Sequence, residues 1–224
     1  MQLSQVKTIE FPHIWSGFNI YSNIKLIKNI YFGGSGLGVE FYQRIHENPI
    51  ICAISAPDRL DAAIKSPCKI LFLLSGDIFN LKNIVFKAKE NNKLIFIHLD
   101  LMEGFSKDVT ALKYISKSIK PHGIITTKSN LIRMAKDMNI FAIQRLFLLD
   151  SLSMESGIKS VREARPNAVE ILPGIMHKAT TYITKQIETP VIAGGLIKDK
   201  EDVILSLKSG AIAISSSSEK IWYM

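Results

Sequence analysis

Two short segments near the C-terminal end carry residues suited to holding a phosphate group. The first is Ala-Gly-Gly-Leu-Ile at residues 193–197, and the second is Ile-Ser-Ser-Ser-Ser-Glu at residues 214–219. Adjacent glycines let the backbone approach a ligand and turn its amides toward it. Serines that begin a short helix add hydroxyl and amide donors at its positive end. A plain turn followed by a helix cap is the alternative. The candidate phosphate ligands are Gly194, Gly195, Ser215, Ser216 and Ser217.

Further polar residues stand within or after other apolar segments, where they could hold the rest of a small phosphate ester. Arg145 and Glu170 lie inside otherwise apolar stretches, and burying either one without a partner would cost several kcal/mol. We therefore expect them to pair with each other, as a structural ion pair, or to face a ligand. His98 fits a satisfied core histidine as well as an acid or base. The candidates for the ligand cavity are His98, Asp100, Thr126, Thr127, Lys128, Gln144, Arg145 and Glu170.

These residues belong to a chain in which eight short apolar segments alternate with stretches of helical spacing. Most of the segments are runs of Ile, Leu, Val, Phe and Ala, which are typical of parallel strands buried on both faces. The alternation predicts a compact, single-domain (β/α)8 barrel of the TIM type, with an open doubly wound sheet as the competing topology. The predicted strands are residues 49–55, 70–76, 94–100, 123–127, 141–147, 168–174, 190–195 and 211–217.

A barrel places its ligand at the carboxyl ends of the strands, and phosphate sites recur at the seventh and eighth strands. The glycine pair and the serine run fall at those two positions, which favours the phosphate interpretation over a turn and a cap. Residues 41–224 are fewer than the about 250 that this architecture usually has, so we expect short connections and no inserted lid. Helices are predicted after Gly76, after the cap-like Ser106-Lys107-Asp108, and at 128–139, 151–164, 175–187 and 199–209.

Composition favours a soluble cytoplasmic protein without a resident cofactor. The hydrophobic fraction is 47% and the mean hydropathy is +0.16, but no apolar run reaches the roughly 18 residues of a membrane span. No pattern of a secretory signal is present at the N-terminus. Cys52 and Cys68 lack the spacing of metal ligands, and we expect buried free thiols. We find no metal-binding array and no dinucleotide fingerprint.

The formal net charge is +8 and the isoelectric point is near 9.4. A basic protein is suited to contact nucleic acid or another polyanion. The lysines are scattered, however, so on the charge alone we favour an ordinary solvated surface over polyanion binding.

Residues 1–40 form a separate N-terminal extension in this interpretation, and the barrel domain spans residues 41–224. The extension carries aromatic residues without a steady period, followed by a glycine-rich run from Gly33 to Gly38. It could be an arm that packs on the barrel or on a partner, and as a phosphate loop it lacks the usual Lys-Ser/Thr. We favour a third explanation, in which translation begins at Val39 and the glycine codons reflect an upstream ribosome-binding site.

From about Phe41 to Trp222 the sequence resembles the glycerol-3-phosphate-responsive antiterminator family, the regulators of glycerol uptake operons. Each of the segments that carry the resemblance is weak alone, but their joint order along the whole barrel is specific. They are FIHLDLMEGFSKD (residues 96–108), GIITTKSNLI (123–132), QRLFLLDS (144–151), EILPGIM (170–176) and AGGLI (193–197).

The resemblance implies a non-catalytic regulator that binds glycerol 3-phosphate and then acts on the leader of a nascent mRNA, so that transcription passes a terminator. The family's ligand pattern falls on Gly194, Gly195 and Ser215–Ser217 for the phosphate, and strand-end position adds Asp100, Lys128, Arg145 and Glu170. Two positions depart from the pattern: His177 stands where proline is expected, and Ser216 stands where threonine is common.

We expect the effector to order the loops after the last three strands and so raise the affinity for a leader hairpin. Lysines near strand ends are the candidates for RNA contacts: Lys107, Lys128, Lys178 and Lys198. One rival is an enzyme that acts on a small phosphate ester, with His98, Asp100 and Glu170 as acid or base groups. Another is a catalytically inactive sensor that binds a protein partner. The sequence leaves open whether the chain forms a homo-oligomer.

Overall fold

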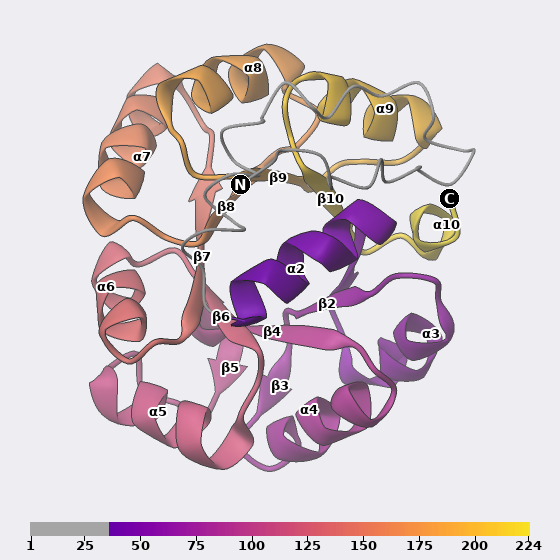
Figure 1. Ribbon diagram of the computed structural model, residues 1–224, viewed down its shortest axis with the longest axis vertical. Coiled ribbons are helices and arrows are strands. Elements are labelled where there is room, and N and C mark those ends of the chain that lie inside the picture. The colour runs from indigo at the N-terminus through magenta and orange to yellow at the C-terminus, as the bar shows by residue number, and fades with distance from the viewer. Residues whose placement is uncertain (1–35) are drawn as a thin grey trace, which may run out of the picture.

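The structure, a computed structural model, describes residues 36–224, and its centre is a closed barrel of eight parallel strands (Figure 1). Closure is made by the pairing of the first strand with the last, which excludes the open doubly wound sheet. The predicted barrel fold is confirmed. In order around the barrel the strands are β1 (Ile50–Ile54), β10 (Ala213–Ser216), β9 (Val191–Gly194), β8 (Ala168–Leu172), β7 (Phe141–Phe147), β6 (Gly123–Thr126), β4 (Leu94–His98) and β2 (Ile70–Leu73).

Helices surround the barrel, one after most strands (Figure 1). Their apolar residues recur three or four apart and pack against the outer faces of the strands. The principal helices are α3 (Leu60–Lys65), α4 (Leu81–Glu90), α5 (Val109–Tyr114), α6 (Ser129–Asp137), α7 (Ser151–Ala164), α8 (His177–Gln186), α9 (Lys200–Lys208) and α10 (Glu219–Trp222).

Several boundaries differ from the sequence-based expectation. The helix after β4 begins at Val109, because the Asp108 carboxylate rather than Ser106 accepts the capping hydrogen bond from the Ala111 amide at 2.9 Å. This helix continues as a π-helical turn, η4 (Ile115–Ile119). The predicted strand 70–76 stops at Leu73, and Gly76–Asp77 forms a separate short strand, β3, that pairs with β5 (Met102–Glu103).

Helix α2 (Gly36–Glu47) lies across the amino end of the barrel (Figure 1). Its Phe41 ring contacts the rings of Phe96 and Phe141 at centroid distances of 5.2 and 4.7 Å. The helix closes the bottom of the barrel, and it crosses the domain boundary predicted between residues 40 and 41. Gly36 and Gly38 of the glycine run are helical residues of α2. The first part of that run, residues 33–35, and the aromatic segment lie outside the described residues, whereas Val39, the proposed start of translation, lies within α2.

Side chains that point inward fill the lower part of the barrel with an apolar core. The core is rich in phenylalanine and isoleucine, and it includes Phe72, Phe96, Ile125, Phe141, Ile143 and Ile192. Because successive side chains of a strand point to opposite faces, each strand presents every second residue to this interior. The amino-end half of the barrel interior is therefore filled by side chains, and any ligand must bind at the carboxyl ends of the strands.

Cys52 and Cys68 are buried free thiols, as expected, and they lie in the outer core between strands and helices. No helix among residues 36–224 is long and apolar enough to cross a bilayer. Within the same residues, no group of three or more His, Cys, Asp and Glu side chains is placed to hold a metal ion.

Candidate functional site at the carboxyl ends of the strands

Toward the carboxyl ends of the strands, the apolar core is followed by a layer of inward-facing residues from five strands. Each of these residues is polar or is a glycine. The residues of this layer, each two positions after a member of the apolar core, are His98, Arg145, Glu170, Gly194 and Ser215. All five belong to the predicted site, and the barrel brings them together from β4, β7, β8, β9 and β10. We call these five residues the polar layer. It lies where barrels of this type hold their ligands.

Glu170 is the centre of the polar layer. Its Oε2 accepts a hydrogen bond from Arg145 Nε at 2.7 Å, and its Oε1 accepts one from the Ser215 hydroxyl. The Glu170 and Arg145 side chains are 1% and 6% exposed, so this is a buried ion pair between neighbouring strands. Of the two alternatives expected for these residues, pairing is confirmed, and contact with a ligand stays a prediction. Such a pair keeps both charges in the barrel without leaving either one uncompensated.

Gly194 is required by the packing of this layer. A Cβ atom at this position would stand 2.4 Å from Ser215 Oγ and 2.8 Å from Glu170 Oε1, which is closer than real atoms come. The absent side chain therefore makes room for the contact between Ser215 and Glu170. Gly195 follows with φ +77°, and Leu196 with φ 62°, so the chain turns sharply at the end of β9.

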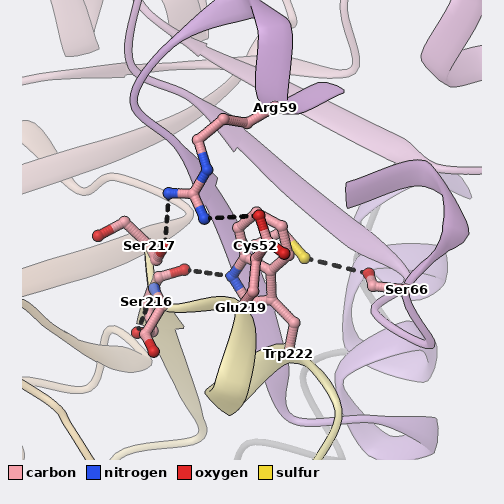
Figure 2. Close-up of polar contacts among 8 residues, drawn as sticks. Cys52, Arg59, Ser66, Ser216, Ser217, Glu219 and Trp222 are labelled. Atoms are coloured by element: carbon pink, nitrogen blue, oxygen red, sulfur yellow. Dashed lines mark hydrogen bonds and ion pairs between the residues drawn. The ribbon is translucent and has the colours of Figure 1, made fainter. Parts of the chain in front are cut away.

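The loop after β10 is held from outside the barrel by two residues that the sequence analysis missed (Figure 2). Arg59 donates to the Ser217 carbonyl at 2.7 Å and pairs with the Glu219 carboxylate at 3.0 Å. Trp222 Nε1 donates to the Ser216 carbonyl at 2.6 Å. A signal for Arg59 was available, because it follows the first strand, and closure makes that strand the neighbour of the last.

Ser215 and Ser216, the first two serines of the run, point in different directions. Ser215 faces the interior and is bonded to Glu170, whereas Ser216 Oγ accepts a hydrogen bond from the Ser218 amide at 3.2 Å. Ser217 is exposed at the rim. Helix α10 has four residues, so backbone amides of the loop, rather than a long helix dipole, are the donors that this corner can offer.

His98 is buried, with 2% of its surface exposed, and its Nδ1 has no hydrogen-bond partner among the described residues. Burial, together with the positive charge of Arg145, lowers its pKa to about 4, against the opposing effect of Asp100. The imidazole is therefore neutral at pH 7. A buried ring nitrogen without a partner is rare in proteins, and it marks a place where a ligand hydroxyl could bind.

Asp100 lies in η3 (Leu99–Leu101), the 3-10 turn after β4, and connects this turn to the end of β6. Its carboxylate accepts hydrogen bonds from the Thr126 hydroxyl, the Thr127 amide and the Thr127 hydroxyl, at 2.7–2.9 Å. Partial burial raises the pKa of Asp100, but these three bonds lower it and their effect is larger, so the pKa lies below its ordinary value. Asp100 thus orders the loop that carries Lys128, whose side chain is exposed.

Two other residues lie apart from the polar layer. Gln144 was a candidate for the cavity, but its side chain points outward and donates to Ser160 of α7 at 2.7 Å. His177, at the start of α8, has a buried Nε2 without a partner among the described residues. The four lysines proposed for RNA contact, Lys107, Lys128, Lys178 and Lys198, are exposed and follow β4, β6, β8 and β9. They therefore share the carboxyl-end rim with the polar layer.

Comparison with known proteins places this geometry in a family. In sequence, the chain is 36% identical to the uncharacterized protein YgcP of Escherichia coli (strain K12). The alignment spans 178 residues, which are 80% of this chain and 93% of YgcP. Among solved structures, it is similar to a glycerol uptake operon antiterminator regulatory protein from Listeria monocytogenes str. 4b F2365. Their TM-score is 0.76, with 33% identity over 78% of this chain and 95% of the other.

A glycerol uptake operon antiterminator-related protein from Thermotoga maritima MSB8 is also similar, with a TM-score of 0.70 and 33% identity over 78% of this chain and 98% of the other. The sequence pattern described as glycerol-3-phosphate responsive antiterminator matches residues 50–222, which contain the whole barrel. The chain therefore belongs to the family of glycerol-3-phosphate responsive antiterminators.

Proposed function

We propose that this protein is a transcription antiterminator that binds glycerol 3-phosphate and, in the bound state, the leader mRNA of glycerol-utilisation genes. The observation that carries the proposal is the polar layer, in which Glu170 holds Arg145 and Ser215 in the space that the lack of a side chain at Gly194 leaves for them. Family membership supplies the class of regulator. We expect the protein to act in the cytoplasm, where nascent mRNA is made, and to need no cofactor beyond the effector.

The polar layer and its rim fit the two halves of glycerol 3-phosphate. The phosphate would lie over the ends of β9 and β10, where Gly195 and Ser217 can offer backbone amides. The glycerol hydroxyls would lie toward His98, whose Nδ1 lacks a partner within residues 36–224. A neutral imidazole and a hydroxyl can each donate or accept, so the pair can satisfy each other in either direction.

The same residues favour a sensor over an enzyme. Both carboxylate oxygens of Glu170 already accept hydrogen bonds, and Asp100 accepts three. These hydrogen bonds use both carboxylates to hold strands and loops together, a role that suits a binding site. Binding without turnover is what the geometry supports.

The RNA surface would be the rim around the effector site. Lys178 and Lys198 follow β8 and β9, whose ends belong to the polar layer, so ordering of these loops would also order their cations, and Lys128 follows β6 on the same rim. The effector can raise RNA affinity only as far as it prefers the ordered state. Contacts with RNA phosphates release counterions, so binding should weaken steeply as salt rises.

A gel-shift titration of leader RNA, with and without glycerol 3-phosphate, tests this function. We expect the effector to increase RNA affinity, and glycerol or inorganic phosphate to do so less. Equal affinity in all conditions would contradict the gating. Conversion of glycerol 3-phosphate in a product assay would favour the enzyme, and a complex with protein that survives nuclease treatment would favour a protein partner.

A further inference from the structure

The loop after β10 has its carbonyl groups held by a cluster outside the barrel wall. This cluster, the loop clamp, consists of Arg59, Glu219 and Trp222 (Figure 2). Arg59 comes from η2 (Pro57–Arg59), the 3-10 turn after β1, and Trp222 from α10. The guanidinium carbon of Arg59 lies 4.9 Å from the centre of the Trp222 ring, so the two holding residues also stack on each other.

The clamp determines where the loop amides point. The Ser216 carbonyl is directed at Trp222 Nε1, and Trp222 belongs to the outer core. Because a peptide unit is planar and trans, the N–H of Ser217 points opposite to the Ser216 carbonyl, away from Trp222 and from β1, on the side of β10 where β9 lies. The Ser217 carbonyl in turn is directed at Arg59. The N–H of Ser218 therefore points away from Arg59, and it is bonded to Ser216 Oγ.

We infer that Arg59 is a positioning residue for the effector phosphate: together with Trp222 it fixes the loop so that the Ser217 N–H faces the phosphoryl oxygens. The inference rests on the proposed function, because it assigns a role at the same effector site. The role assigned to Arg59 is indirect, because its two terminal nitrogens donate to Ser217 of the loop and to Glu219. Without Arg59, the Ser217 carbonyl would lose its donor and the Trp222 ring would lose the guanidinium stacked on it, so the peptide units on both sides of Ser217 would be held less firmly.

The clamp also gives the site an intrinsic reporter. The chain has two tryptophans, and Trp222 is fully buried against the loop. In a full-length Trp15→Phe background, the fluorescence of Trp222 alone follows the loop. Occupation of the Ser217 amide changes the polarity of the peptide whose carbonyl bonds the indole, so ligand binding should change the emission.

The test is a titration of this parent protein and its variants with inorganic phosphate and with glycerol 3-phosphate, followed by Trp222 fluorescence and by calorimetry. We expect Arg59→Met to weaken both ligands about tenfold, as loss of a charge-assisted contact implies, and Arg59→Lys to restore part of the affinity. Trp222→Phe, which removes the indole donor, should weaken both ligands as well, as calorimetry would show.

Arg44→Met is the matched control. Arg44 is also an arginine in an ion pair, with Glu40 at 3.3 Å, and it donates to Asn92 at 2.7 Å, but it lies on α2 at the amino end of the barrel. The Arg44→Met substitution should change thermal stability, but it should change ligand affinity by no more than about twofold. A purely structural role for Arg59 would give the same result as Arg44, so the comparison separates positioning from folding.

The outcomes are distinct. If the parent binds both ligands and Arg59→Met binds them equally well, the positioning role is overturned and the proposed function stands. If Arg59→Met weakens phosphate but the parent shows no preference for glycerol 3-phosphate, the positioning role is supported and the proposed effector is contradicted. If the parent binds neither ligand, the proposed function fails, and the role assigned to the clamp fails with it.

Discussion

Arg145 and Glu170 sit directly opposite each other on the neighbouring strands β7 and β8, with 2.7 Å between Nε and Oε2. They are the charged residues that close the top of an apolar barrel. The pair does not stand alone, because the other oxygen of Glu170 holds Ser215 of β10. The Glu170 carboxylate thus links three strands around the position where the ligand is proposed to bind. Both the stability of the fold and the affinity for the ligand should therefore depend on it.

Breaking this ion pair on one side should be costly. Arg145→Met leaves the Glu170 charge buried without a counter-ion, and we expect unfolding by urea to show a loss of about 3–5 kcal/mol. The double variant Arg145→Met/Glu170→Leu removes both charges, so it should recover most of the stability. It should nevertheless bind no glycerol 3-phosphate, because the polar layer is gone. If Arg145→Met proved as stable as the wild type, the ion pair between Arg145 and Glu170 could not be buried as described.

A methyl group at Gly194 should disturb the site from within. The added Cβ of Gly194→Ala would meet Ser215 Oγ at 2.4 Å, so Ser215 must leave Glu170 or the strand must shift. We expect a loss of stability of about 1–3 kcal/mol, measured by urea unfolding, together with a loss of effector affinity in calorimetry.

Gly38→Ala is the control for this substitution. Gly38 lies in helix α2, where an added Cβ meets no atom of the described part of the chain within 4 Å. Alanine in a helix is favoured over glycine, so stability should rise by about 0.5–1 kcal/mol while effector affinity stays the same. Equal effects of the two substitutions would contradict the role given to Gly194.

Sequence was sufficient for the barrel because its strands are buried on both faces and therefore appear as continuous apolar runs. It was also sufficient to mark Arg145 and Glu170, since a charge inside such a run needs a partner. It could not separate Arg145 from its neighbour Gln144. Adjacent strand residues point to opposite faces, and only the register decides that Arg145 faces inward and Gln144 faces Ser160.

The residues missed by the sequence analysis act over long separations. Arg59 and Ser217 are 158 positions apart, and their contact exists only because β1 and β10 pair to close the barrel. No local pattern around Arg59 indicates the carbonyl that it will hold. The cap of α5 was missed for a local reason, because Ser106 and Asp108 are both good caps and the choice depends on where the chain leaves β5.

Stability should fall as the pH is lowered through the range between the two pKa values of His98. The pKa is about 4 in the folded protein and near 6.5 when the side chain is exposed, so the unfolded chain binds the proton more readily. The contribution of neutral His98 is complete above pH 6.5 and is lost as the pH falls toward 4. Each unit between these values contributes about 1.4 kcal/mol, so the loss is about 3 kcal/mol.

His98→Gln tests this assignment by urea unfolding at several pH values between 7 and 4.5. Arg145, Asp100 and Lys107 remain in place around the site, and glutamine does not titrate, so the decline should become shallower. Part of the slope should persist, because burial lowers the pKa of His122 to about 4 as well, with Lys89 also contributing. An unchanged slope in the variant would show that His98 is not the titrating group.

The rim lysines should determine how salt affects RNA binding. Replacing Lys178 or Lys198 by Gln removes one phosphate contact, so the slope of log affinity against log salt should decrease by about 0.7–0.9 for each. Lys208→Gln is the control, because Lys208 is exposed in the last turn of α9, at the opposite end of the barrel. Binding of leader RNA in the presence of glycerol 3-phosphate, measured between 50 and 200 mM salt, gives the slopes. If the two rim variants keep the wild-type slope while Lys208→Gln lowers it, the RNA lies on the amino-end face instead.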